Sequence, residues 1–128
     1  MSKTNFTPAA LGALRLAQEN AARLGHSYVG SEHLLLGLVS QEYSPAARLL
    51  RERGASRAAL RQSIALLVGT GVPSRSLYQG LTPQCRQAIC RGVQDCRILG
   101  HPAVNDRHLL LGLLAKECTA RTLLNDGG

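Results

Sequence analysis

The sequence predicts an all-α fold, a pseudo-two-fold tandem repeat of four-helix units in which the second repeat lacks its last helix. Three observations lead to this prediction. Aromatic residues are scarce and the apolar residues are mostly Leu and Ala, a mixture that favours helices over strands. Apolar residues recur at helical spacing between positions that can begin or end a helix. Finally, one motif of the first half returns in the second half.

The repeated motif reads GHSYVGSEHLLLGL at 25–38 and GHPAVNDRHLLLGL at 100–113. The two copies lie about 75 residues apart, and both end with His-Leu-Leu-Leu-Gly-Leu. A Thr-Pro pair precedes each copy at the same separation, beginning at Thr7 and at Thr82. The period is too long for a common solenoid unit and only two copies are present, so the pattern indicates a duplication within one domain.

The first half is predicted to form four helices, at about 8–24, 32–41, 45–53 and 57–68. Each follows a hydroxyl residue that can act as its N-cap, namely Thr7, Ser31, Ser44 and Ser56. The stripes expected to face the core are Leu11, Leu14, Ala17, Ala21 and Leu24, then Leu34, Leu35 and Leu38, then Leu60, Ile64, Leu67 and Val68. The runs Leu34–Leu36 and Leu109–Leu111 are expected to lie in the core.

The second half is predicted to repeat the first three helices, at about 83–99, 106–116 and 119–125, with no counterpart of the fourth. Residues 70–81 are rich in Gly, Pro and Ser and are expected to connect the halves. We therefore expect one domain over 1–128, with repeat one at about 7–69, the linker at about 70–81 and repeat two at about 82–128.

Composition restricts the function classes. The formal charge is +7, which suits acidic partners or nucleic acid, but the arginines are scattered along helical segments. Cys85, Cys90, Cys96 and Cys118 are confined to the second half, which favours free thiols in a reducing cytosol over a disulfide framework. The N-terminus has no apolar signal region and no apolar run is long enough to span a membrane, so a cytoplasmic location is expected.

Other repeated residues are expected to be structural. His26, His33, His101 and His108 lack a recurring carboxylate or cysteine that would complete a metal-ligand set, so the sequence predicts no metal site. No cofactor is expected. Gly37 and Gly112 lie inside predicted helices, where glycine is unfavourable by about 1 kcal/mol relative to alanine. Their repetition predicts a close approach between helices.

The duplicated motif, each copy preceded by a Thr-Pro helix start, resembles the N-terminal domain of the Clp ATPases, most closely the ClpC type. The resemblance extends over about 6–128. It implies a non-catalytic domain of an AAA+ unfoldase that recruits protein substrates and adaptor proteins, upstream of the ATPase rings that feed the ClpP protease. The sequence contains no G-x-x-x-x-G-K-[ST] phosphate loop, so it does not hydrolyse ATP by that route.

The resemblance also implies candidate site residues, because some ClpC-type domains bind phosphoarginine. Glu32 would pair with the guanidinium, while Thr7 and Ser31 would lie near the phosphate. The matching position in the second repeat is Arg107, which would repel a guanidinium, so the site at Thr82 and Arg107 is expected to be silent or altered. The competing interpretation gives Glu32 only a capping or dipole role.

Two other functions stay open from the sequence. One is a stand-alone accessory or decoy protein that carries this domain. The other, of a different class, is a basic helical nucleic-acid-binding domain, which would need arginines gathered on one face. An enzyme is disfavoured because no cysteine has a base at catalytic spacing.

Overall fold

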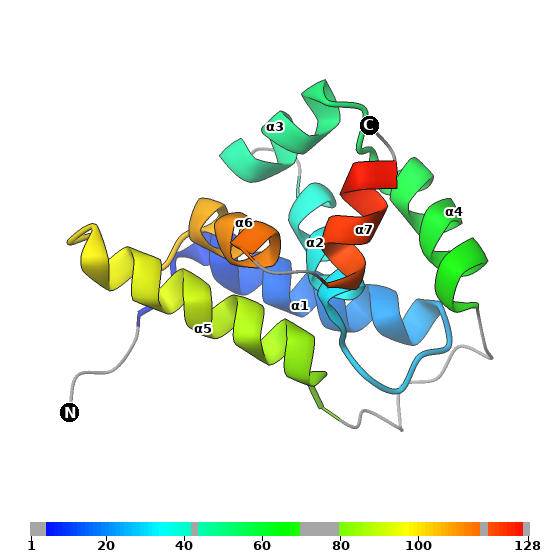
Figure 1. The fold of residues 1–128 in the computed structure, drawn as a ribbon, viewed down its shortest axis with the longest axis horizontal. Coiled ribbons are helices and arrows are strands. Elements are labelled where there is room, and N and C mark those ends of the chain that lie inside the picture. The colour runs from blue at the N-terminus through cyan, green and yellow to red at the C-terminus, as the bar shows by residue number, and fades with distance from the viewer. Residues whose placement is uncertain (1–4, 42–43, 70–79, 116–117, 127–128) are drawn as a thin grey trace.

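The computed structural model describes residues 5–41, 44–69, 80–115 and 118–126. These residues form seven helices and no strand, which confirms the all-α prediction (Figure 1). The helices are α1 (Pro8–Arg23), α2 (Ser31–Val39), α3 (Pro45–Glu52), α4 (Arg57–Val68), α5 (Pro83–Ile98), α6 (Asp106–Ala115) and α7 (Thr119–Asp126). Their ends agree with the predicted ends to within two residues. Of the predicted connector, only Gly80 and Leu81 are described, and Lys116 also lies outside the described residues.

Hydroxyl side chains begin four of these helices. Thr7, Ser44, Ser56 and Thr82 each accept a hydrogen bond of 3.0–3.2 Å from the amide three residues later. The predicted cap at Ser31 is wrong, because Ser31 is the first residue of α2 and Gly30 is its N-cap. There the amide of Gly30 donates to Nδ1 of His33 at 2.8 Å. The hydroxyl of Ser31 instead accepts a hydrogen bond from an amide of α7.

Helix α2 lies at the centre of the molecule. All nine of its residues are buried, and it packs against each of the other six helices (Figure 1). The closest approach is to α1, where a Cβ on Gly37 would lie 2.8 Å from the backbone nitrogen of Ala17. In the second repeat, a Cβ on Gly112 would lie 3.2 Å from the nitrogen of Gly92 in α5. The predicted close helix approach at both glycines is confirmed.

The two repeats are joined by reciprocal backbone pairing. Phe6 forms a parallel bridge with Val104, and Val29 forms one with Leu81. A shift of about 75 residues converts Phe6 into Leu81 and Val29 into Val104, so the two bridges are counterparts. Each repeat therefore pairs the residues before its first helix with the turn that precedes the second helix of the other repeat. This exchange is the pseudo-two-fold relation.

Three leucines predicted for the core are exposed instead: Leu11 (54%), Leu67 (54%) and Leu111 (50%). The buried face of α1 consists of four alanines and Asn20, because α2 comes close to it, and Leu11 lies outside that face. Leu67 lies in the last turn of α4, which packs only on α2 and α7 among the described elements. Leu111 lies on α6, where the described residues include no counterpart of α4. The side chain of Val68 is outside what the structure describes.

Replacing Gly37 with alanine should destabilise the fold. The added methyl group meets the backbone of α1, which can move only by separating the two helices, so we expect a loss of about 1–3 kcal/mol in unfolding free energy. Urea denaturation measures this loss. Gly12→Ala is the control, because a Cβ there meets only the end of the flexible Gln41 side chain. Equal stability of the two variants would contradict the tight α1–α2 contact.

Candidate functional site

Glu32 lies in the first turn of α2 and is only 5% exposed. Its carboxylate folds back toward Gly30, where an added Cβ would lie 2.8 Å from Cδ of Glu32. Burial raises the pKa of Glu32, against the opposing effects of a hydrogen bond from its own backbone amide and of nearby His26. The ion pairs found among the described residues are Arg15–Glu19, Arg48–Glu52 and Arg91–Asp95, and none of these three includes Glu32. The Glu32 carboxylate thus lies at the end of a helix that favours a negative charge, in surroundings that disfavour it.

Two residues whose pKa is affected by Glu32, Tyr28 and Cys85, were not predicted from the sequence to belong to this site. Burial, followed by the charge of Glu32, raises the pKa of Tyr28. Burial also raises the pKa of Cys85 to about 12, with smaller effects from Glu32 and then Cys118. Cys85 lies in the first turn of α5 and stays a thiol at neutral pH, so it is not a nucleophile. The sequence shows only that Cys85 follows Thr82 by three positions, which does not indicate that it lies near Glu32.

The structure places Glu32 near the start of α5. The amide of Thr82 donates to the carbonyl of Val29 at 2.9 Å, three residues before Glu32. The amide of Thr7 instead donates to the carbonyl of Val104 in the other repeat, also at 2.9 Å. Each Thr-Pro helix start therefore lies beside the motif of the opposite repeat.

Thr7 lies toward the other end of α2 from Glu32. The side-chain amide of Gln41, just beyond the end of α2, donates to the carbonyl of Ala9 at 2.7 Å. At 1.5 Å per residue, the helical rise between positions 32 and 41 is about 13 Å. The structure therefore does not bring Thr7 to Glu32. It brings Thr7 to the segment that precedes the exposed Arg107.

Ser31 and Asp106, the first residues of α2 and α6, cap helices of the opposite repeat. The Ser31 hydroxyl accepts a hydrogen bond from the amide of Ala120 in α7 at 3.2 Å. The Asp106 carboxylate accepts one from the amide of Ala46 in α3 at 2.8 Å. All four residues are buried, and leaving a buried amide unpaired would cost about 1–3 kcal/mol. Ser31 and Asp106 thus share a structural role although they differ in type, and the sequence signal for it was an oxygen acceptor at equivalent positions.

The histidines form hydrogen-bonded pairs in both repeats. His33 accepts from the Gly30 amide through Nδ1, so its Nε2 carries the proton and donates to Nδ1 of His26 at 2.6 Å. His26 then donates from Nε2 to the carbonyl of Gly69 at 2.8 Å. In the second repeat, Nε2 of His108 lies 2.8 Å from Nδ1 of His101. In the first repeat the pair links the start of α2 to the end of α4.

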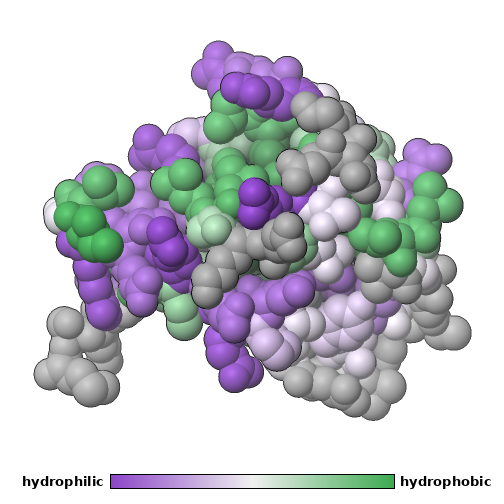
Figure 2. All heavy atoms as spheres, viewed as in Figure 1, coloured by the Kyte–Doolittle hydropathy of each residue, from purple (hydrophilic) through white to green (hydrophobic). Residues whose placement is uncertain are grey.

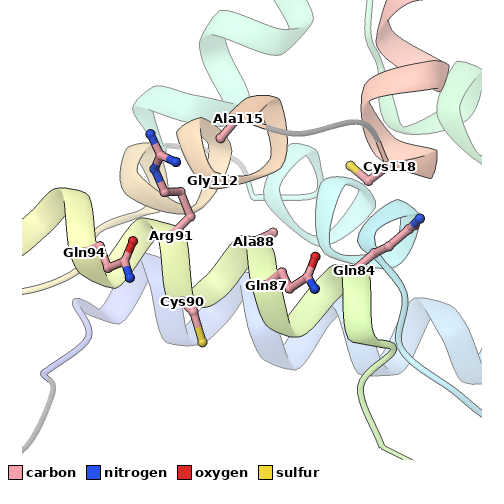
Figure 3. Close-up of a pocket in the computed structure, with 9 residues that line it drawn as sticks. All are labelled: Gln84, Gln87, Ala88, Cys90, Arg91, Gln94, Gly112, Ala115 and Cys118. Atoms are coloured by element: carbon pink, nitrogen blue, oxygen red, sulfur yellow. The ribbon is translucent and has the colours of Figure 1, made fainter.

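A hollow lies along the outer side of α5 and α6 (Figure 3). It has a volume of about 210 Å³, and mostly polar side chains of α5 line it, including Gln84, Gln87 and Arg91. In the first repeat, the side chain of Gln41 reaches α1 at the corresponding place. The counterpart of Gln41 is Lys116, which lies outside the described residues. None of the candidate site residues predicted from the sequence lines this hollow.

Comparison with known proteins identifies the family. A family model described as the Clp repeat (R) N-terminal domain matches residues 5–126. The chain belongs to the Clp N-terminal domain family. This domain is a non-catalytic part of the Clp ATPases. The resemblance seen in the duplicated motif is thereby confirmed.

Among relatives, the chaperone protein ClpB of Oceanobacillus iheyensis is 37% identical over 96% of this chain and 15% of its own length. The chloroplastic chaperone protein ClpC1 of Arabidopsis thaliana is 36% identical over 95% of this chain and 13% of its own length. The chain thus spans about one seventh of these relatives.

Solved structures show the same fold. The N-terminal domain of ClpD from Arabidopsis thaliana superposes with a TM-score of 0.80 at 21% identity, over 95% of this chain and 86% of that chain. The N-terminal domain of Hsp104 from Candida albicans has a TM-score of 0.75 at 18% identity, over 97% and 82%. In the described part of this Clp N-terminal domain, no helix has the length and apolar character needed to cross a membrane.

Acid should destabilise the domain through His33. Burial, followed by nearby His26, lowers the pKa of His33 from 6.5 to about 3. Because the folded-state pKa is lowered, the contribution of neutral His33 to the unfolding free energy is complete above about pH 6.5. It is lost as the pH falls toward 3. One group contributes at most about 1.4 kcal/mol per pH unit. Urea midpoints of wild type and His33→Gln between pH 7 and 4 measure the effect. Identical slopes of the urea midpoint against pH in the two proteins would contradict this role of His33.

Proposed function

We propose that this chain is a substrate- and adaptor-recognition domain of a Clp-type AAA+ unfoldase that acts in ATP-dependent protein degradation. The family match over residues 5–126 carries the proposal. Its partners are protein substrates, adaptor proteins and Clp ATPase rings, on the same or a separate chain, and through these rings the ClpP protease. The domain itself is not an enzyme, and it works in the cytoplasm.

The arrangement of buried groups supports a binding role over a catalytic one. The thiol of Cys85 is held protonated beside Glu32. The ring nitrogens of His26 and His33 are engaged with each other and with backbone groups. Ser31 accepts a helix amide across the repeats. Side chains used in this way hold a shape, which suits recognition of another protein.

Grafting tests the recognition role. Residues 1–128 replace the N-terminal domain of a ClpC-type ATPase, and degradation of an adaptor-dependent substrate with ClpP is measured. We expect the graft to degrade the substrate faster than the ATPase that lacks any N-terminal domain. ATPase activity without substrate is the control for correct assembly. A graft that assembles but degrades no faster than the deletion would overturn the recognition role.

Within this function, we propose that the first-repeat motif binds phosphoarginine. The carboxylate of Glu32 pairs with the guanidinium in a bidentate fork. The phosphate lies at the N-terminus of α5, at Thr82, because the structure places that helix start beside Glu32. Ser31 is adjacent, and a hydroxyl that accepts one hydrogen bond can still donate another. Since Glu32 is 5% exposed, the ligand has to displace the side chains that cover it.

The second-repeat counterpart differs in charge. Arg107 takes the place of Glu32 and would lie beside the start of α1 at Thr7. Its guanidinium offers only donors and repels a second guanidinium. This half is therefore silent toward phosphoarginine, or it binds a plain anion or an acidic protein surface.

Calorimetry with free phosphoarginine tests this site. We expect one binding site per chain, loss of binding in Glu32→Ala, and little change in Arg107→Ala. Binding should also weaken as the pH falls through the raised pKa of Glu32, because a protonated carboxyl pairs poorly with a guanidinium. Glu32→Gln, similar in size and uncharged, separates the loss of charge from the loss of packing. Two equal sites in the wild type, or undiminished binding by Glu32→Gln, would contradict the assignment.

A further inference from the structure

Two aromatic rings near Glu32 take no part in the site proposed above. Tyr28 and His26 lie in the turn before α2 and are partly exposed, whereas Glu32 is buried. Burial, followed by the charge of Glu32, raises the pKa of Tyr28. The pKa of Glu32, which burial raises, is lowered in part by His26. Both rings therefore lie within electrostatic range of the carboxylate, on a side of it that reaches solvent.

The ring of Tyr28 lies against rings that are themselves held in place. Its centroid is 5.5 Å from that of His26, with an angle of 8° between the planes, and 5.4 Å from that of His33. Nδ1 of His26 lies 2.6 Å from Nε2 of His33, and Nε2 of His26 lies 2.8 Å from the carbonyl oxygen of Gly69. Next to the tyrosine, the turn is fixed by the bridge between Val29 and Leu81. Tyr28 is thus a preformed part of the surface near Glu32.

The other neighbour of Glu32 lies toward the core. Cys85, whose pKa is raised by burial and then by Glu32, is 0% exposed. The turn between α1 and α2 runs along the surface at the lower right of Figure 1. In Figure 2 the surface over this turn is white to purple, so it lies outside the apolar surface between α3 and α6. A polar ligand that reaches Glu32 therefore passes the partly exposed rings.

The second repeat lacks both this ring and this acid. It keeps the histidine pair, since Nε2 of His108 lies 2.8 Å from Nδ1 of His101. It differs at three alternate positions of the motif, which read Tyr28, Gly30 and Glu32 in the first repeat and Ala103, Asn105 and Arg107 in the second. A Cβ at the middle position of the first repeat would lie 2.8 Å from Cδ of Glu32, so the glycine leaves room for the carboxylate. The three first-repeat residues thus form one set.

An aromatic ring beside a carboxylate suits a guanidinium in particular. The guanidinium is planar and delocalised, so it stacks on an aromatic face while its N–H groups point outward in its own plane to a carboxylate. An attraction between cation and ring is stronger where water is excluded, as it is near the buried Glu32. The two side chains can therefore hold the same group through different atoms.

We propose that Tyr28 is a ligand-contacting residue of the first repeat, whose ring stacks on the guanidinium of phosphoarginine while Glu32 accepts its N–H groups. This inference rests on the phosphoarginine site proposed above and adds the residue that selects a planar cation. Gly30 leaves the space for the carboxylate, and the histidine pair only supports the ring. The absence of the ring at Ala103 is a second reason, besides Arg107, for the second repeat to be silent toward phosphoarginine.

Variants at position 28 separate the ring from its bulk and its hydroxyl. In calorimetry with free phosphoarginine, Tyr28→Leu should weaken binding at least about tenfold, because leucine fills space but has no aromatic face. Tyr28→Phe should bind within about twofold of wild type, because it keeps that face. Urea denaturation of both variants shows whether they fold alike.

The outcomes distinguish this inference from the proposed function. A wild type that does not bind phosphoarginine overturns the proposed site, and the role of Tyr28 with it. If wild type binds and Tyr28→Leu binds equally well, the site stands and the role of Tyr28 is overturned. An equal loss of binding in Tyr28→Phe and Tyr28→Leu would assign the effect to the hydroxyl and overturn the stacking.

Transfer to the second repeat tests the ring without altering the first. Ala103→Tyr combined with Asn105→Gly and Arg107→Glu should give two phosphoarginine sites per chain. The matched control carries only Asn105→Gly and Arg107→Glu, and its second site should be at least about tenfold weaker. The unaltered first site reports in both variants that the chain folds. A second site of equal affinity in the control, or no second site in the triple variant, would overturn the proposal.

Discussion

The burial of α2 against six other helices is the constraint on which the rest of the structure depends. A helix buried on all sides can have no large side chain where it meets its closest neighbour, and Gly37 meets the alanine face of α1. The same arrangement recurs between Gly112 and α5. Two closely packed helix pairs therefore form the frame of the domain. Glycine costs helix propensity at both positions, and the dispersion attraction between closely packed helices offsets that cost.

The two pairs are fixed to one another by reciprocal contacts between the repeats. The bridges at Phe6–Val104 and Val29–Leu81 are one device, and the buried caps supplied by Ser31 and Asp106 are the other. Both connect a segment of one repeat to a helix start of the opposite repeat. Neither repeat therefore completes all of its own helix ends, because the acceptors for the buried amides of Ala46 and Ala120 lie in the other half.

This exchange also determines which helix start lies near each motif. Glu32 lies near the start of α5, because the amide of Thr82 pairs with the carbonyl of Val29, three residues before Glu32. At the equivalent place beside α1, Arg107 supplies a positive charge. The repeats are alike in backbone but carry opposite charges at this one position, which is why the proposed phosphoarginine site belongs to the first repeat alone. A further asymmetry is that α4 packs on α2 and α7, whereas no described helix packs in the equivalent way on α6 and α3.

The sequence by itself determined the helices and their pairing into repeats, because hydroxyl caps, prolines and glycines act within a few residues of where they stand. It also indicated the close contacts at Gly37 and Gly112, since glycine inside a helix needs a packing reason. Only the tertiary structure decided that Ser31 caps α7, that Glu32 lies near the start of α5 instead of the start of α1, and that Leu111 is half exposed. These features depend on which surface each helix meets, and local patterns carry no information about contacts between segments far apart in the chain.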